Sequence, residues 1–275
     1  MFHFFIQDFV EFLYLFKPIK GNTDLDNYAR ELRENGIVIV EDFLNAAVCD
    51  NFVEEIDAVV ARDKKNPELT KSEIQYRDFN SLDGYDTGMI DIVNIDRDFP
   101  KIWDDFDPKK IETIIKIATA RTLYFRTFNA YLNYSVTNTR GMHVDDVQPP
   151  VYKAFVTLKD INSTDDGPYT FVKKTHRLNL IRYINLFINF FVTSKIVTNF
   201  DLYSKKQVVQ TIAKKGALVI SNQTGIHSGH PQKPNHKRCM LVLSYLVVSP
   251  LNRIHRTAKD IIKNSSKIIS QKDCS

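Results

Sequence analysis

Residues 216–248 read GALVISNQTGIHSGHPQKPNHKRCMLVLSYLVV and contain two apolar segments, 217–221 and 239–248, joined by a loop. Both segments are rich in the aliphatic and β-branched side chains that favour strands, and the loop contains the Gly and Pro residues that are typical of turns. We therefore expect two β-strands here, with His227 and His230 in the loop that connects them.

Segments of the same composition continue through the second half of the chain, from residue 123 onward. They are residues 128–136, 152–158 and 169–172. Several short strands separated by turns predict a β-sandwich or a β-barrel. A long apolar segment at about residues 178–205 interrupts the pattern, and we expect a helical insertion over one end of the barrel, either as core packing or as a lid.

The first half of the chain has helical patterns instead. Residues 22–24 can cap a helix that runs to about Glu34, and Gly36 can end it. Two further helices and one short buried strand are expected at residues 45–62, 109–121 and 37–40, respectively. The N-terminal part, residues 1–122, is thus predicted to be mainly helical.

No internal repeat and no Gly/Ser-rich or Pro-rich linker divides the 275 residues, so the sequence predicts a single domain spanning residues 1–275. This domain combines the helical N-terminal part, a β core at residues 123–250 and a basic amphipathic helix at residues 251–275. The expected fold class is mainly β with helical decoration.

The composition is that of an ordinary globular protein. Hydrophobic residues make up 43% and charged residues 25% of the chain, which allows a sizeable core. The net charge of +4 is too small to indicate a nucleic acid partner. Cys49, Cys239 and Cys274 are few, odd in number and far apart, so they predict neither disulfides nor a zinc site and favour a reducing, cytoplasmic setting.

Both ends of the chain have amphipathic patterns. Residues 1–16 have Phe at helical spacing, but they carry Asp8 and Glu11 and lack the basic segment and cleavage site of a signal peptide. We expect a helix packed on the domain, with weak contact to a membrane surface as the alternative. For the basic segment at residues 251–275 we expect an ordinary helix with a solvated face, with contact to an anionic membrane or a partner as the alternative. The pattern indicates no particular oligomeric state.

The segment Gly141-Met142-His143-Val144-Asp145 contains a His-x-Asp triplet. Side chains two residues apart in an extended chain point to the same face, so His143 and Asp145 can approach one cation together. The triplet alone also fits a loop histidine beside a solvated aspartate. Asp146 is an alternative to Asp145, although its side chain should face away.

A third metal ligand is expected from the loop that follows strand 217–221. His227 lies in this loop, 84 residues after His143 (143 to 227). Two histidines and one carboxylate form the facial set that suits iron(II) and leaves positions open for an oxo-acid and dioxygen. His230 is the alternative third ligand.

Arg238 opens the strand that follows this loop, eleven residues after His227 (227 to 238). A hairpin can aim it into the barrel, where a buried cation needs an anion. Its planar guanidinium matches a carboxylate, and the distal carboxylate of 2-oxoglutarate is the natural partner. Lys237 is its neighbour, on the opposite face of a regular strand.

Polar side chains on the earlier strands are further candidates for contact with 2-oxoglutarate. Tyr131 and Asn133 share one face of the strand at residues 128–136, and an ordinary place in the barrel wall is the alternative for both. Lys153 and Thr157 are weaker candidates of the same kind.

Taken together, these motifs resemble the phytanoyl-CoA dioxygenase family over most of the chain. The resemblance rests on LRENGIVIVEDFL at residues 32–44, HVD at 143–145, KAF at 153–155, DGPY at 166–169, THR at 175–177, and His227 with Arg238. Lys174 stands where the family usually has Gly in the turn before its His. By this resemblance, His143, Asp145 and His227 hold the metal and Arg238 anchors 2-oxoglutarate.

The resemblance implies a double-stranded β-helix, the cupin-like jelly roll, that binds iron(II) and uses 2-oxoglutarate and dioxygen. Decarboxylation to succinate and CO2 would be coupled to hydroxylation of a C–H bond in a small organic or lipid-like substrate. Asp145 argues against the halogenating relatives, which lack this ligand, and Ser244 against the nucleobase demethylases, which have a second Arg there. A cupin-like metal-dependent isomerase or hydrolase, or a non-catalytic binding protein, is the alternative.

Overall fold

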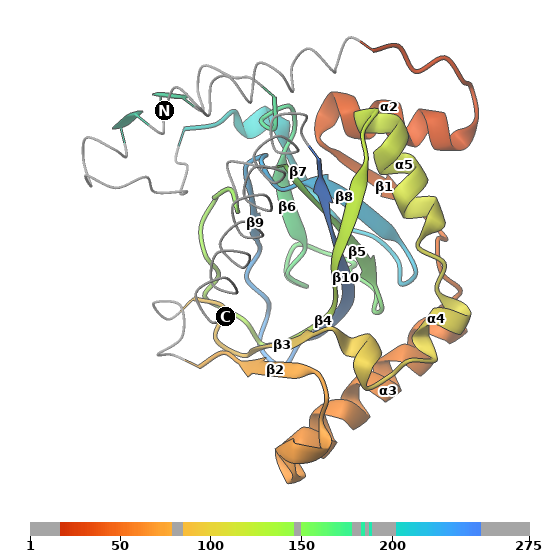
Figure 1. Cartoon of the computed structure of the whole chain (residues 1–275). Coiled ribbons are helices and arrows are strands. Elements are labelled where there is room, and N and C mark those ends of the chain that lie inside the picture. Colours follow the sequence, from red (N-terminus) through yellow and green to blue (C-terminus); the bar gives the residue numbers. More distant parts are fainter. Residues whose placement is uncertain are drawn as a thin grey trace, which may run out of the picture.

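A computed structural model describes residues 17–78, 85–145, 150–177, 183–184, 187–188 and 202–248. In this part of the chain, two antiparallel β-sheets pack against each other, and helices cover the outer face of the larger sheet (Figure 1). The helices predicted at residues 1–16 and 251–275 lie outside the described residues, as does most of the insertion predicted at about residues 178–205.

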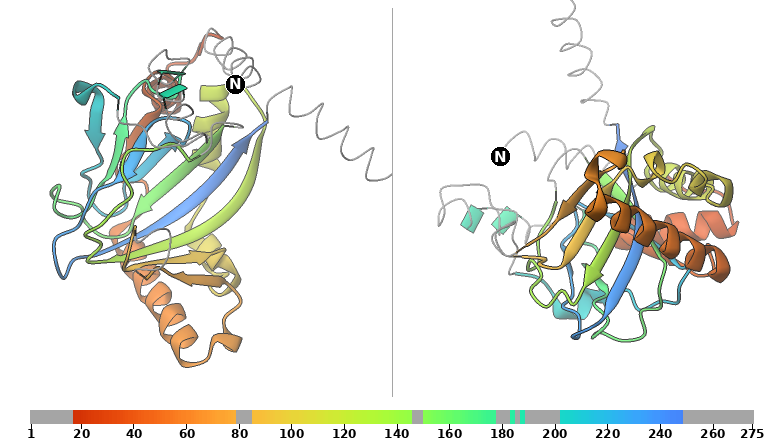
Figure 2. Two further views of the ribbon diagram at one scale, coloured as in Figure 1. Left: turned by 90° about the vertical axis from the view of Figure 1, so that its left-hand side faces the viewer. Right: turned by 90° about the horizontal axis from the view of Figure 1, so that it is seen from below.

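The larger sheet has seven described strands and the smaller sheet three, all paired antiparallel. In spatial order the larger sheet contains β1 (Ile37–Val40), β8 (Leu218–Asn222), β5 (Val151–Thr157), β10 (Lys237–Val247), β4 (Leu123–Tyr134), β3 (Met89–Val93) and β2 (Glu73–Tyr76). The smaller sheet contains β7 (Val208–Gln210), β6 (Tyr169–Val172) and β9 (His227–Gly229). Figure 2 shows the long, twisted strands β4, β5 and β10 side by side.

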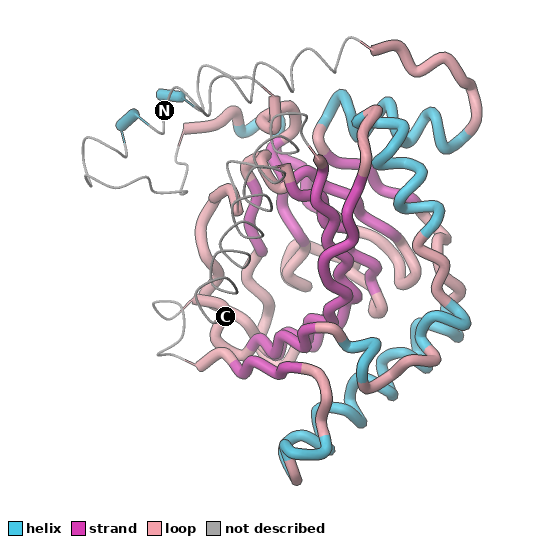
Figure 3. Tube along the Cα trace, viewed as in Figure 1, coloured by secondary structure: helices cyan, strands magenta, loops and turns pink. Residues whose placement is uncertain are grey.

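The helices lie on the side of the larger sheet that faces away from the smaller one (Figure 3). They are α2 (Asp24–Asn35), α3 (Ala46–Lys65), α4 (Ile102–Asp105) and α5 (Lys109–Thr119). Short 3-10 turns lie at η1 (Pro67–Leu69), at η3 (Ile95–Arg97) and, next to β7 of the smaller sheet, at η4 (Lys205–Gln207). Helix α2 begins with a capping box between Thr23 and Asp26 and ends at Gly36, whose φ of 82° suits glycine. The predicted cap and end of this helix are both confirmed.

Alternation along β10 explains why the larger sheet is buried on both faces. Leu241 and Leu243 pack with the helices in the main hydrophobic core, whereas Met240 and Val242 point the other way and pack with the smaller sheet. Complete burial of an aliphatic side chain stabilises the fold by about 1.5–3 kcal/mol. Because the inward faces of both sheets line the space between them, polar residues at inward positions are placed there as well.

The predicted fold class, mainly β with a cupin-like jelly roll, is confirmed. Two strands in the part predicted to be mainly helical, β2 and β3, were not predicted. Cys49 and Cys239 are buried and free, whereas Cys274 lies outside the described residues. Among the residues that the structure describes, no helix has both the length and the apolar character that a membrane crossing needs.

Candidate metal centre and adjoining cavity

His143 and His227 form a short antiparallel bridge at the edge of the smaller sheet. The N–H of His143 donates to the carbonyl of His227 at 2.9 Å, and the N–H of His227 donates to the carbonyl of His143 at 2.8 Å. Residues that exchange both hydrogen bonds project their side chains on the same face of a sheet. The two imidazole rings accordingly lie with their centroids 4.6 Å apart.

Asp145 completes the group, because it lies two residues beyond His143 on the same extended segment. Its Oδ1 is 3.4 Å from Nε2 of His143 and 3.5 Å from Nε2 of His227. Possible ligand atoms of the three residues all lie within 4.8 Å of one another. The three side chains predicted as metal ligands therefore meet at one point.

Both imidazoles present Nε2 to this point. Nδ1 of His143 lies 2.7 Å from the carbonyl oxygen of Gly141, and Nδ1 of His227 lies 2.9 Å from that of Gly225. A carbonyl can only accept, so each Nδ1 carries the proton and each Nε2 keeps a lone pair. Backbone contacts of this kind fix the tautomer and ring orientation that a metal ligand needs.

At the centre, burial favours neutral imidazole at His227, and the positive charge of Lys153 favours ionised carboxylate at Asp145. Burial lowers the pKa of His227, although the Asp145 carboxylate opposes this shift. For Asp145, burial acts to raise the pKa, but its contacts with the two histidines and the positive charge of Lys153 outweigh burial and hold the pKa well below its usual value. Two neutral nitrogens and one anionic oxygen are the donor set of the facial iron(II) sites.

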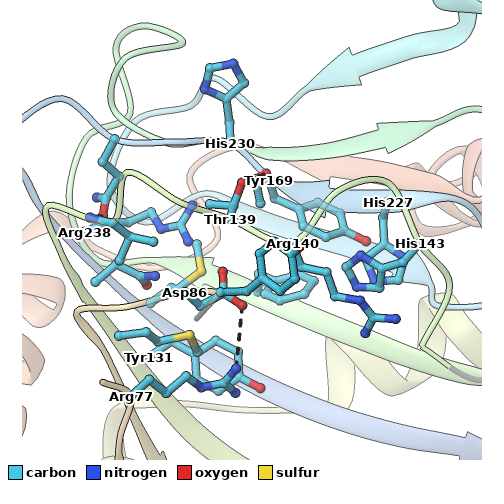
Figure 4. A pocket seen from close by; sticks show the side chains of 18 of the residues that line it. Arg77, Asp86, Tyr131, Thr139, Arg140, His143, Tyr169, His227, His230 and Arg238 are labelled. Carbon is cyan, nitrogen blue, oxygen red and sulfur yellow. Dashed lines mark hydrogen bonds and ion pairs between the residues drawn. The ribbon is translucent and has the colours of Figure 1, made fainter. Parts of the chain in front are cut away.

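A cavity of about 570 Å³ opens from the three side chains and extends between the sheets. Figure 4 shows His143 and His227 on one side of this cavity and Arg238 on the other. Its wall includes Tyr131 and Asn133, the two further candidates predicted for 2-oxoglutarate binding. Both project inward from β4, and Asn133 is the cross-strand partner of Arg238.

Arg238 is a buried cation with unused hydrogen-bonding capacity. One Nη atom donates to the carbonyl of Gly167, while Nε has no hydrogen-bond partner in the described part of the chain. Burial lowers the pKa of Arg238 to about 10, a shift that the charge of Asp86 only partly opposes. No carboxylate among the described residues lies within ion-pair distance of it, so the guanidinium can receive an anion from outside.

Two amides extend this polar end of the cavity. Oδ1 of Asn133 and Nε2 of Gln232 are buried without a hydrogen-bond partner among the described residues, and both side chains line the cavity. Buried polar atoms are normally paired, so unpaired atoms around one cavity indicate a ligand or ordered water. Gln232 was not predicted, because its place depends on contacts with Gly167 and Val136 from other strands and loops.

The alternative candidates fall at different places. His230 lines the cavity but points away from the two metal-facing histidines, with its Nδ1 beside the carbonyl of Pro231 (Figure 4). Lys237 lies on the opposite face from Arg238, and its ammonium pairs with Asp57 of α3. Thr157 donates to the backbone carbonyls of Lys214 and Ala217 and is absent from the cavity wall. Asp146 lies outside the described residues.

The cavity contains further polar groups, most of which were not predicted from the sequence. Lys153, weighed as a contact for 2-oxoglutarate, lines the cavity and donates to Oδ2 of Asp145 at 2.5 Å. The Tyr169 hydroxyl lies 3.1 Å from that of Ser221 and accepts from the amide of Gln223. Arg77, Asp86 and Arg140 also line the cavity, with Arg77 3.6 Å from Asp86. From the sequence, the position of Lys153 in the cavity could be predicted only from the alternation of side chains along β5, which points this residue inward.

Comparison with solved structures finds the same fold in several proteins. SnoN, a non-haem 2-oxoglutarate-dependent epimerase from nogalamycin biosynthesis, superposes with a TM-score of 0.59 at 16% identity, covering 81% of this chain and 82% of SnoN. AviO1 from Streptomyces viridochromogenes gives 0.58 at 14% identity, covering 84% and 97%. HygX from Streptomyces hygroscopicus, with nickel and 2-oxoglutarate bound, gives 0.55 at 13% identity, covering 82% and 87%.

At these identities the likeness extends to the fold alone. No family model and no curated protein matches the sequence. The fold and the His-Asp-His group together define a cupin-like jelly roll with a candidate metal centre. Membership of the phytanoyl-CoA dioxygenase family stays a prediction.

Proposed function

We propose that the chain is an iron(II)- and 2-oxoglutarate-dependent oxygenase. The observation that carries this proposal is the combination of three convergent ligand atoms with a buried arginine at the far side of the same cavity. A metal site alone would fit many cupin-like proteins, but a second fixed cation is what a bidentate oxo-acid with a distal carboxylate requires. HygX has nickel and 2-oxoglutarate bound in the same fold.

In this proposal, His143, Asp145 and His227 hold iron(II), each through one atom. Arg238 pairs with the distal carboxylate of 2-oxoglutarate, and the unpaired amides of Asn133 and Gln232 contribute hydrogen bonds. The bound metal supplies the activation of dioxygen that side chains cannot perform. The protein supplies orientation, because the sheets place the metal-facing atoms and the carboxylate anchor on rigid strands.

We further propose that the substrate is a small polar molecule that is hydroxylated at a C–H bond. The cavity wall beyond the metal ligands carries Arg77, Asp86, Thr139 and Arg140. An apolar chain placed against these groups would remove them from water without replacing their hydrogen bonds, which is costly. A polar substrate therefore fits this wall better than the lipid-like one that the sequence left open.

The test has two stages. In the absence of oxygen, 2-oxoglutarate should bind the Fe(II)- or Mn(II)-loaded protein and raise its thermal stability, but should not do so for the metal-free protein. With oxygen and Fe(II), succinate should form, and a screen of polar metabolites should yield a product heavier by one oxygen atom. A metal-loaded protein that fails to bind 2-oxoglutarate would exclude this function. A product without an added oxygen would exclude the hydroxylation alone.

A further inference from the structure

The two oxygens of the Asp145 carboxylate have different surroundings. Oδ1 faces Nε2 of both His143 and His227, at 3.4 and 3.5 Å. Oδ2 accepts a hydrogen bond from the ammonium of Lys153 at 2.5 Å. A carboxylate with both oxygens free could bind a metal through one oxygen or through both. Here the ammonium makes the two oxygens different, because it contacts Oδ2 and leaves Oδ1 facing the imidazoles.

The fold, rather than chance rotation of a surface side chain, brings Lys153 to this place. On β5, Ala154 and Val156 point outward into the core beneath the helices, so Lys153 and Phe155 point inward. The cross-strand partners of Lys153 are the small residues Ser221 and Ser244, which leave room for a long side chain. An inward Lys in the middle of a sheet is costly unless an anion receives it.

Asp145 needs such a partner because the sheet does not fix its side chain. The bridge to His227 ends at His143, and beyond it, among the described residues, the backbone of Asp145 makes one long hydrogen bond of 3.3 Å, to the carbonyl of Gln223. Within the described ranges, Lys153 is the one group that donates to Oδ2. The ammonium thus determines how the carboxylate plane is turned toward the imidazoles.

We propose that Lys153 is a positioning residue that restricts Asp145 to one-oxygen metal ligation. This inference rests on the proposed function. Three protein ligand atoms leave three positions of an octahedral metal open, which a bidentate oxo-acid and dioxygen need. A carboxylate that bound through both oxygens would take one of these positions. Lys153 therefore keeps the site open for the oxo-acid by occupying Oδ2, without touching the metal or the oxo-acid itself.

Lys153→Met tests this role, because methionine keeps much of the length of the side chain and removes its ammonium. The matched control is Lys237→Met on β10, since Lys237 also pairs with an aspartate but lies on the outer face. The metal probe is Co(II), whose absorption spectrum reports the number and arrangement of its ligands. Titrations without oxygen then give the affinity for Co(II) and, in the Co(II)-loaded protein, for 2-oxoglutarate. Circular dichroism verifies that each variant is folded.

In Lys153→Met we expect three results together. The Co(II) spectrum changes, because the second carboxylate oxygen joins the metal. Co(II) binds at least as tightly as in the unaltered protein, because a ligand atom is gained and a nearby positive charge is lost. The affinity for 2-oxoglutarate falls at least about tenfold, because the oxo-acid must displace a bound carboxylate oxygen; changing residues that orient metal ligands has effects of this size on activity. Lys237→Met should match the unaltered protein in all three measurements.

Other combinations overturn the proposal. An unchanged Co(II) spectrum with weaker 2-oxoglutarate binding would mean that Lys153 contacts the oxo-acid directly. Loss of Co(II) binding in a folded variant would mean that the ammonium is needed for the ligand set itself, and an unchanged affinity for 2-oxoglutarate would remove the positioning role. If the unaltered protein binds Co(II) but no 2-oxoglutarate, the proposed function fails, while the spectrum of Lys153→Met still reports whether Asp145 changes its ligation.

Discussion

His143 and His227 are joined by two backbone hydrogen bonds, so the spacing of their imidazoles is set by the sheet before any ion binds. This pairing explains how residues far apart in the sequence form one metal-facing pair. It also distinguishes His227 from His230, since a residue three positions later has left the bridge and its side chain points away (Figure 4).

Replacement of His227 by alanine should abolish tight metal binding, while His230→Ala should retain it. His227 supplies one of the three convergent atoms, whereas Nδ1 of His230 lies beside the carbonyl of Pro231. The measurement is calorimetric titration with Co(II) or Mn(II), together with thermal unfolding to verify the fold. Equal metal affinity of the two variants would contradict the assignment of His227.

Arg238→Met should weaken the binding of 2-oxoglutarate without affecting the binding of the metal. A hydrogen bond to a charged group contributes about 1.5–3 kcal/mol, which corresponds to a loss of roughly 10- to 100-fold in affinity. Lys237→Met is the control, because Lys237 is the adjacent residue but faces Asp57 on the outside. If both variants bind 2-oxoglutarate like the unaltered protein, the carboxylate is anchored elsewhere.

The meeting of His143, Asp145 and His227 and the place of Arg238 in the same cavity match the sequence prediction, while their roles as metal ligands and anchor stay proposals. His143 and Asp145 are two residues apart, and the strand that Arg238 opens is uniformly apolar. The role of Lys153 could not be predicted, because alternation on β5 places it inward but does not say which group lies opposite. That group is Asp145, and its position follows from the pairing of His143 with His227.

The two missed strands have weak patterns for physical reasons. Strand β2 lies at the edge of the larger sheet and is largely exposed, so its four residues, EIQY, show no buried face. Strand β3, MIDIV, is buried, but it contains Asp91, which interrupts the apolar run. Non-local pairing decides both, because β3 pairs with β4 and β2 pairs with β3. Arg77 and Asp86, which flank these two strands and line the cavity, therefore also escaped prediction.

Gly167→Ala should both destabilise the fold and weaken the binding of 2-oxoglutarate. The residue has a φ of 73°, and an added Cβ would lie 2.4 Å from Cγ of Gln232 and 2.9 Å from the carbonyl oxygen of His230. Its own carbonyl accepts a hydrogen bond from Arg238. We expect a loss of more than about 1 kcal/mol in the free energy of unfolding, measured with urea.

The matched control for this change is Gly141→Ala. An added Cβ at Gly141 meets no atom within 4 Å, and its backbone is not in the left-handed region. The control should therefore stay within about 0.5 kcal/mol of the unaltered protein. If Gly167→Ala behaves like this control in both stability and binding, the contact of Gly167 with Arg238 does not contribute to the binding of 2-oxoglutarate.

Asp91→Asn should make the protein relatively more stable as the pH rises. Asp91 is buried on β3, 3.8 Å from Arg77, and burial raises the pKa of its carboxyl to about 6, although Arg77 and Lys153 oppose the shift. The unfolded chain has a pKa near 3.8 for this group, so ionisation costs folding free energy that accumulates between about pH 4 and pH 6. Above that window the cost is constant, at about 3 kcal/mol.

Asparagine at position 91 cannot ionise, so the variant avoids this cost. The free energy of unfolding of Asp91→Asn minus that of the unaltered protein should rise between pH 4 and pH 6.5 and then level off.

Asp98→Asn is the control of opposite sign. Burial acts to raise the pKa of Asp98, but hydrogen bonds from Ser72 and Lys71 and the charge of Arg62 lower it overall. Its ionised form therefore stabilises the fold, so Asp98→Asn should lose relative stability as the pH rises from acid towards about 4 and should then stay level. Urea unfolding at four pH values measures both differences, and parallel curves for the two variants would contradict the environment assigned to Asp91.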